Sequence, residues 1–214
     1  MIAYASMTGT KRNLAALRGA GWRVMISPKA MTNPQDFRYA MDNGAWWAFQ
    51  NNQPFDVAAF ERVLAFRGAD ADWIVIPDIV MGGMESLALS RRWLRNLRRR
   101  KALRGAKFML AVQNGMEPHH VKRLIGPRVG IFVGGDTEWK LATMRQWASL
   151  AHDRGAICHV GRVNTAKRIR LCEAAGVDSF DGSSASRFAV SLPPLEMARR
   201  QTDIEGYLER GRAA

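Results

Sequence analysis

A chain of 214 residues is long enough to bury one substantial hydrophobic core, so we expect a single domain over residues 1–214. Its apolar runs are far shorter than the roughly 20 residues that cross a bilayer, and we expect no membrane segment. The formal net charge of +13 attracts polyanions such as DNA or RNA but says nothing about catalysis. The N-terminus starts with a strand-like run instead of a secretion signal, which predicts a cytoplasmic protein.

Short apolar runs alternate with amphipathic stretches along the chain. They predict eight strands, at residues 2–6, 22–27, 38–41, 73–77, 107–112, 129–134, 156–160 and 177–180. Helices are expected before residue 20, from about residue 56, over the basic run 91–104, after Pro118, and at 137–154, 164–175 and 195–210.

The predicted strands are apolar throughout and are separated by helices, which is typical of a parallel sheet covered on both faces. Eight such strands favour a compact (β/α)8 TIM-like barrel of the α/β class with short loops. A doubly wound open sheet is the alternative. In both architectures, functional side chains collect at the carboxyl ends of the strands.

Polar residues and a glycine pair stand at these strand ends. They are Asp42, Asp78, Gln113 and Asp181, with Gly134 and Gly135 after the sixth strand. Together they predict a pocket that holds a purine-like base beside a nucleophilic carboxylate. Each aspartate alone has a simpler interpretation, as a cap of the helix that follows it.

The densest basic run extends from Arg91 to Arg104. Leu87, Leu94 and Leu97 form an apolar stripe at helical spacing, so the arginines occupy the opposite face. This face is either an ordinary solvated surface or one that follows a phosphate backbone. The two cysteines, Cys158 and Cys172, lack the spacing of metal ligands; we expect buried, reduced thiols and no metal.

Five segments follow the predicted strands in chain order: MDNGAWW, IVIPDIV, MLAVQNG, IFVGGD, and CHVGRVNTAKRIRLCEAAGVDSFDGSSASR. They resemble motifs of the tRNA-guanine transglycosylases (queuine and archaeosine tRNA-ribosyltransferases). The resemblance is greatest to the short members from phages and bacteria that put 7-deazaguanine bases into DNA. It implies a bacterial or phage-encoded enzyme that acts in the cytoplasm. A phage-encoded enzyme would act in the cytoplasm of the host.

The resemblance implies a role for each matching residue. Asp181 would be the nucleophile that attacks C1′ of the sugar, and Asp42 would move the proton of the departing or incoming base. The residues matching the base-binding positions are Asp78, Gln113, Gly134 and Gly135 on the polar edge, with Trp46 and Val160 on the two faces. Arg187 matches an arginine that contacts a phosphate.

The sequence also departs from the family. It has no counterpart of the Cys-x-Cys-x-x-Cys…His zinc site or its subdomain, which favours DNA over tRNA and leaves the oligomeric state open. The second half of the Gly-Gly motif is replaced by residues 136–139. The resemblance therefore predicts a DNA-guanine transglycosylase with a free 7-deazaguanine base as co-substrate and no cofactor. A minimal tRNA-guanine transglycosylase and a non-catalytic nucleic-acid-binding barrel are the alternatives.

Overall fold

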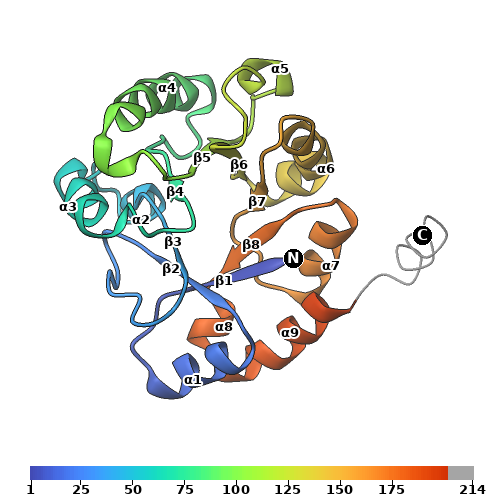
Figure 1. Cartoon of the computed structure of the whole chain (residues 1–214). Coiled ribbons are helices and arrows are strands. Elements are labelled where there is room, and N and C mark those ends of the chain that lie inside the picture. The colour runs from blue at the N-terminus through green and yellow to red at the C-terminus, as the bar shows by residue number, and fades with distance from the viewer. Residues whose placement is uncertain (202–214) are drawn as a thin grey trace.

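The computed structural model describes residues 1–201, and within them eight parallel strands close into a barrel in the order β1 to β8. The strands are β1 (Ile2–Ser6), β2 (Arg23–Ile26), β3 (Tyr39–Met41), β4 (Ile74–Val75), β5 (Phe108–Val112), β6 (Val129–Val133), β7 (Cys158–Val160) and β8 (Ser179–Gly182). Figure 1 shows them at the centre with the helices arranged around them. The predicted barrel is confirmed, and the open sheet is excluded because β8 pairs with β1.

Helices follow most of the strands. They are α1 (Lys11–Gly19), α2 (Ala45–Gln50), α3 (Val57–Arg67), α4 (Gly83–Arg99), α5 (Pro118–Val121), α6 (Thr137–Asp153), α7 (Ala166–Ala174), α8 (Ser184–Arg187) and α9 (Leu192–Arg200), with short 3-10 turns at Lys101–Leu103 and Ala189–Ser191. The sequence did not predict α2 and α8. The last predicted helix starts earlier, at Leu192, and ends at Arg200, while its predicted portion 202–210 lies outside the described residues.

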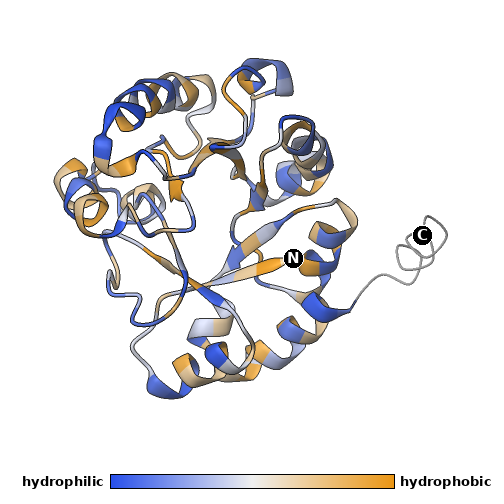
Figure 2. Cartoon of the chain, viewed as in Figure 1, coloured by the Kyte–Doolittle hydropathy of each residue, from blue (hydrophilic) through white to orange (hydrophobic). Residues whose placement is uncertain are grey.

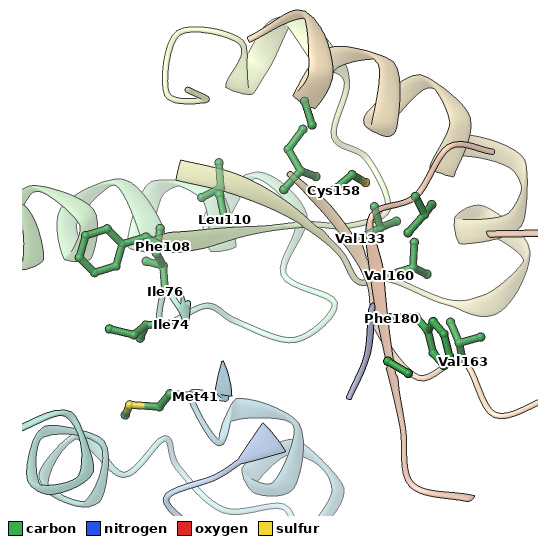
Figure 3. Packing of buried hydrophobic residues seen from close by; sticks show 14 of the residues in the cluster. Met41, Ile74, Ile76, Phe108, Leu110, Val133, Cys158, Val160, Val163 and Phe180 are labelled. Carbon is green, nitrogen blue, oxygen red and sulfur yellow. The ribbon is translucent and has the colours of Figure 1, made fainter. Parts of the chain in front are cut away.

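Alternate residues of each strand face the barrel axis, and the others face the helices. In β5, Phe108, Leu110 and Val112 belong to the large hydrophobic core between the strands and the helices, part of which Figure 3 shows. Met109 belongs to a smaller cluster inside the barrel, and Ala111 lines a cavity at its open end. Both faces of the sheet are covered, so the strands are hydrophobic over most of their length (Figure 2).

All strands except β1 differ by one or two residues at one or both ends from their predicted boundaries, and the differences at β4 and β8 have local reasons. β4 is only two residues long, and Pro77 beyond it has no N–H to extend the ladder. β8 begins two residues later than predicted and includes Asp181, because Asp181 pairs with Tyr4 of β1. Asp181 is therefore held by the ladder itself and does not lie in the loop after it.

Two smaller predictions also have an outcome. Cys158 and Cys172 are buried free thiols, as expected. None of the helices within residues 1–201 is both long enough and apolar enough to cross a membrane.

A charged cluster closes the amino-terminal end of the barrel. Asp72 accepts hydrogen bonds from the hydroxyl of Tyr4 (3.0 Å) and from the guanidinium groups of Arg23 (2.9 Å) and Arg38 (2.6 Å). Burial and the negative charge of Asp72 raise the pKa of Tyr4 to about 12. The cluster satisfies the polar groups beneath the aromatic interior and leaves the opposite end of the barrel for the cavity.

We predict that Asp72→Ala lowers the free energy of unfolding by about 2–3 kcal/mol, because it removes the common acceptor of Tyr4 and Arg23. Urea unfolding followed by circular dichroism measures the change. The control is Asp36→Ala, which breaks an ion pair of Asp36 with Arg18 whose side chains are 73% and 41% exposed, and we expect no measurable change there. Equal effects of the two variants would contradict this role of Asp72.

Candidate functional site

A cavity of about 270 Å³ opens at the carboxyl end of the barrel strands. Eight of the nine residues predicted from the sequence line it: Asp42, Trp46, Asp78, Gln113, Gly134, Gly135, Asp181 and Arg187. They come from loops and strands that are far apart in the chain and meet because the strands are parallel. The volume is slightly below the roughly 300–1,000 Å³ typical of ligand sites, which suits one small molecule.

Asp42 directly follows β3 and enters the cavity wall where the chain turns into α2. The turn depends on Gly44, which adopts a left-handed conformation (φ 86°) and donates its N–H to Asp42 Oδ2 (3.2 Å). Burial, and after it the negative charge of Asp181, raise the pKa of Asp42 to about 6. Asp42 can thus exchange a proton near neutral pH, as a general acid or base must.

Asp78 lies at the centre of an amide-carboxylate chain. Its Oδ1 accepts from Asn43 Nδ2 (2.8 Å), and its Oδ2 accepts from Gln113 Nε2 (3.2 Å). Burial nevertheless raises the pKa of Asp78 to about 6, with a smaller contribution from the charge of Asp42. The two donors fix the direction in which the carboxyl group faces the cavity.

Gln113 directly follows β5 and has its amide orientation set by acceptors. Nε2 also donates to the carbonyl of Ile79 (2.9 Å) and to Ser86 Oγ (2.8 Å). The Oε1 atom is buried and has no hydrogen-bond partner among the described residues. A buried carbonyl without a donor is uncommon, and the residue that carries it lines the cavity.

Gly134 and Gly135 form the turn between β6 and α6. The N–H of Gly134 donates to Val112 O (2.8 Å) in the barrel, so this N–H is not available to a ligand. Gly135 has φ 70°, and a side chain there would lie 2.5 Å from Asn114 Oδ1. The turn is fixed because Asp136 caps α6 and also bonds Asn114.

Trp46 lies on α2 and contributes an aromatic wall. The guanidinium of Arg162 lies 4.0 Å from the centre of its ring, a cation–π contact, and also donates to the carbonyl of Gly135. Arg162 lines the same cavity. A base that stacks on this face of Trp46 must therefore displace the guanidinium.

Asp181 reaches the cavity from β8, and its side chain is 14% exposed. Its Oδ1 lies 3.0 Å from Nε2 of His159, and its Oδ2 accepts from the backbone N–H of Arg162 (3.3 Å). Both carboxylate oxygens are thus held by the protein. Such a group has a fixed direction of attack on an atom placed in the cavity.

Val160 does not line the cavity, which corrects the expectation that it contacts the face of a base. It is 2% exposed and packs in the core outside the barrel, close to Val133 and Phe180 (Figure 3). Neighbouring residues of a strand point in opposite directions, and His159 already faces the barrel interior. Val160 must therefore face the helices.

Arg187 ends α8 and is exposed at the cavity rim. The short helix is held from two sides: Asn13 of α1 donates to Ser186 O (2.7 Å), and Asn164 Oδ1 accepts from the N–H groups of Ser183 and Ser184. The support fixes the backbone of α8 next to Asp181. It leaves the guanidinium of Arg187 at the rim, where an anionic group outside the cavity can reach it.

Sequence reasoning missed several residues of the site. They are Asn43, Phe132, His159 and Arg162. A signal existed for His159, because a single polar residue within the apolar run 156–160 must lie on one face of the strand. No comparable signal marked Arg162, whose position depends on the left-handed backbone conformation there (φ 60°).

Within residues 1–201, no group of three or more His, Cys, Asp or Glu side chains is arranged to hold a metal ion. Comparison with known proteins found no family model and no curated protein sequence that matches the chain. The transglycosylase resemblance therefore stays a prediction, and the geometry of the cavity is the main indication of function.

We predict that Asp42→Asn raises the free energy of unfolding at pH 8 by about 1–2 kcal/mol and changes it little at pH 4. The folded protein binds the Asp42 proton with a pKa of about 6, against 3.8 for an ordinary aspartate. Stability is therefore lost as the pH rises between these values, and the loss persists above pH 6. Asparagine carries no such charge, so the variant avoids the loss. Urea unfolding at both pH values measures it.

Asp56→Asn is the matched control. Asp56 caps α3 and pairs with Lys29 at 2.6 Å, and this hydrogen bond together with that from Ala59 lowers its pKa. The sign is opposite, so we expect Asp56→Asn to destabilise the protein at pH 8. If Asp42→Asn destabilised the protein, and did so more at pH 8 than at pH 4, folding would not raise the pKa of Asp42.

Proposed function

We propose that the protein is a DNA-guanine transglycosylase, which exchanges guanine in DNA for a free 7-deazaguanine base through a covalent glycosyl-aspartate intermediate. The main support is the convergence of Asp42, Asp78, Gln113 and Asp181 on one cavity of a size suited to a single base. The motif resemblance supports the same assignment. The target guanine has to leave the DNA stack to enter such a cavity.

In the first half of the proposed reaction, a carboxylate oxygen of Asp181 attacks C1′ of the deoxyribose. The bond between C1′ and N9 of guanine breaks, its electron pair stays on the base, and the base takes a proton from Asp42. The products are a glycosyl ester on Asp181 and free guanine. The raised pKa of Asp42 supports its role as the acid, because a useful fraction is protonated near pH 6.

In the second half, a 7-deazaguanine base occupies the place of guanine. Asp42, now ionised, accepts the N9 proton of the incoming base while N9 attacks C1′ and the ester bond to Asp181 breaks. Two inversions at C1′ give net retention of configuration. Nothing is oxidised or reduced, and the base is the sole co-substrate.

The polar edge of the base would face Asp78 and Gln113. A purine such as guanine presents N–H donors and a carbonyl acceptor on that edge, and Asp78 offers carboxylate oxygens held in place by Asn43 and Gln113. Trp46 would stack on the base after Arg162 moves, which contributes about 1–3 kcal/mol. Arg187, which is exposed at the rim, would contact a phosphate beside the extruded nucleotide.

The choice of DNA also draws on the charge of α4. The exposed face of this helix carries Arg91, Arg92, Arg95, Arg98 and Arg99. None of the five forms an ion pair with a carboxylate of residues 1–201, whereas the neighbouring Arg100 pairs with Glu61. Arg91 donates to the carbonyl of His120 (2.7 Å). Exposed arginines on a rigid helix, without a carboxylate partner among the described residues, suit the phosphates of a nucleic-acid backbone.

The experiment that tests the function incubates the protein with DNA carrying tritiated guanine and with candidate 7-deazaguanine bases. We predict release of labelled guanine and a protein–DNA adduct that survives denaturation. For Asp181→Ala and Asp181→Asn we expect release to fall by roughly 1,000-fold or more, with no adduct. Scintillation counting and denaturing gels measure the two outcomes.

Asp153→Asn, which removes a carboxylate at the end of α6 on the outside of the barrel, is the control and should exchange at the parental rate. Exchange by Asp181→Asn at the parental rate would remove Asp181 from the mechanism. A tRNA substrate is tested in parallel, and incorporation there but not in DNA would replace the DNA assignment. DNA binding by the parent without exchange on either substrate would favour the non-catalytic alternative.

A second prediction concerns α4. We expect Arg95→Gln with Arg99→Gln to weaken binding to duplex DNA several-fold and to reduce the slope of log affinity against log salt by about 2, one for each lost phosphate contact. Fluorescence anisotropy over a salt series measures both. The control is Arg154→Gln with Arg170→Gln, which removes the same amount of charge at two other exposed positions. Arg154 lies at the end of α6, and Arg170 lies in α7. Equal effects of the two pairs would assign the binding to net charge alone.

A further inference from the structure

Behind Asp181, a polar chain runs through the interior of the barrel. His159 lies in β7, is fully buried, and packs against Trp73 and Phe132 at ring-centre distances of 4.7 and 4.9 Å. Its Nε2 is 3.0 Å from Asp181 Oδ1, and its Nδ1 is 2.9 Å from Ser179 Oγ. A polar ring in an aromatic interior has to satisfy both nitrogens, and here it does so with one partner on each side.

The direction of these hydrogen bonds follows from chemistry. Burial lowers the pKa of His159, so the ring is neutral and carries one N–H. An ionised carboxylate can only accept, which puts the proton on Nε2 and directs it to Asp181. Nδ1 then accepts from the hydroxyl of Ser179. The donor order is Ser179, His159, Asp181.

A second chain reaches the other oxygen of Asp181 from α6. The ammonium group of Lys140, which is 4% exposed, donates to the carbonyl of Gly161 (2.5 Å). The N–H of the same peptide unit belongs to Arg162 and donates to Asp181 Oδ2 (3.3 Å). The C=O and N–H of a trans peptide point in opposite directions, so Lys140 and Asp181 lie at its two ends. A cation at the oxygen polarises the peptide and strengthens donation by its N–H.

The backbone on both sides of this peptide is restricted to one conformation. Arg162 has φ 60°, a left-handed conformation that is unfavourable for a residue with a side chain. At Gly161, a Cβ atom would lie 2.7 Å from the ring of Phe132 and 3.3 Å from Asp181 Oδ1, so only glycine fits. The strained backbone of Arg162 and the glycine required at position 161 together set the direction of the Arg162 N–H.

We propose that His159 and Lys140 are positioning residues, which hold the two oxygens of Asp181 so that its free lone pairs face the cavity. The proposal rests on the nucleophilic role of Asp181 stated above. Donors on both oxygens stabilise the carboxylate more than its ester. Asp181 is therefore a better leaving group when the incoming base displaces it. Its side chain is also already oriented for attack on C1′.

Paired substitutions test the proposal. Methionine at position 159 or 140 keeps an unbranched side chain of intermediate volume but donates no hydrogen bond, whereas glutamine keeps an N–H donor at the end of the side chain. We expect His159→Met and Lys140→Met to lower kcat of base exchange about 10- to 100-fold with little change in KM for the free base. His159→Gln and Lys140→Gln should retain most of kcat. A purely structural role would penalise glutamine, the more polar residue, as much as methionine.

Thermal unfolding of all four variants separates loss of fold from loss of positioning. With a folded methionine variant, parental kcat would overturn the assignment of that residue. So would a glutamine variant that is as slow as the folded methionine variant, because the donor is then not what matters. If a methionine variant does not fold, its glutamine partner and the spectra described next decide for that residue.

A spectroscopic readout works even if no base is exchanged. In 15N-labelled full-length protein, the imidazole spectrum of His159 should show a neutral ring protonated at Nε2, with the N–H protected from exchange with water. Asp181→Ala should move that proton resonance upfield and speed its exchange, and Lys140→Met should shift the amide resonance of Arg162. A ring protonated at Nδ1, or resonances that ignore both substitutions, would overturn the arrangement. Inactivity of the parent with these signatures present would instead refute the proposed function alone.

Discussion

The closed parallel barrel imposes a parity on every strand, and the site depends on it. Once β8 pairs with β1, alternate residues of each strand have to face the axis and the others the helices. That constraint directs Asp181 and His159 inward from neighbouring strands and Val160 outward. A shift of one residue in the register of β8 would turn the carboxylate of Asp181 into the hydrophobic core.

Three carboxyl groups share one small cavity in a protein whose net charge is +13. The positive charge does not neutralise them, because most of it is on exposed helices, and burial dominates the raised pKa values of Asp42 and Asp78. Donors hold both oxygens of Asp78, from Asn43 and Gln113, and both oxygens of Asp181, from His159 and the backbone of Arg162. Similar side chains in one cavity thus differ in the groups that hold them.

Much of the fold was predictable because its signal is local. The eight apolar runs and their spacing specified the barrel, and the polar residues after them specified Asp42, Asp78, Gln113 and Asp181 as members of one site. The errors arose where tertiary contacts decide: the pairing of Tyr4 with Asp181 shifted β8, Gly44 and Asn164 supported short helices with no periodic pattern, and strand parity removed Val160. The hydrogen bonds of Lys140 and Arg162 join residues 19 to 21 positions apart and leave no pattern in the sequence.

Arg162 connects two walls of the cavity through one residue. Its guanidinium rests on the indole of Trp46, and its own N–H holds Asp181. A planar molecule that stacks on the indole of Trp46 has to displace the guanidinium of Arg162. The backbone N–H of the same residue is the one that donates to Asp181. The cation–π contact with Trp46 and the hydrogen bond to Asp181 thus belong to a single residue, so the two walls of the cavity are linked by one side chain and its own backbone.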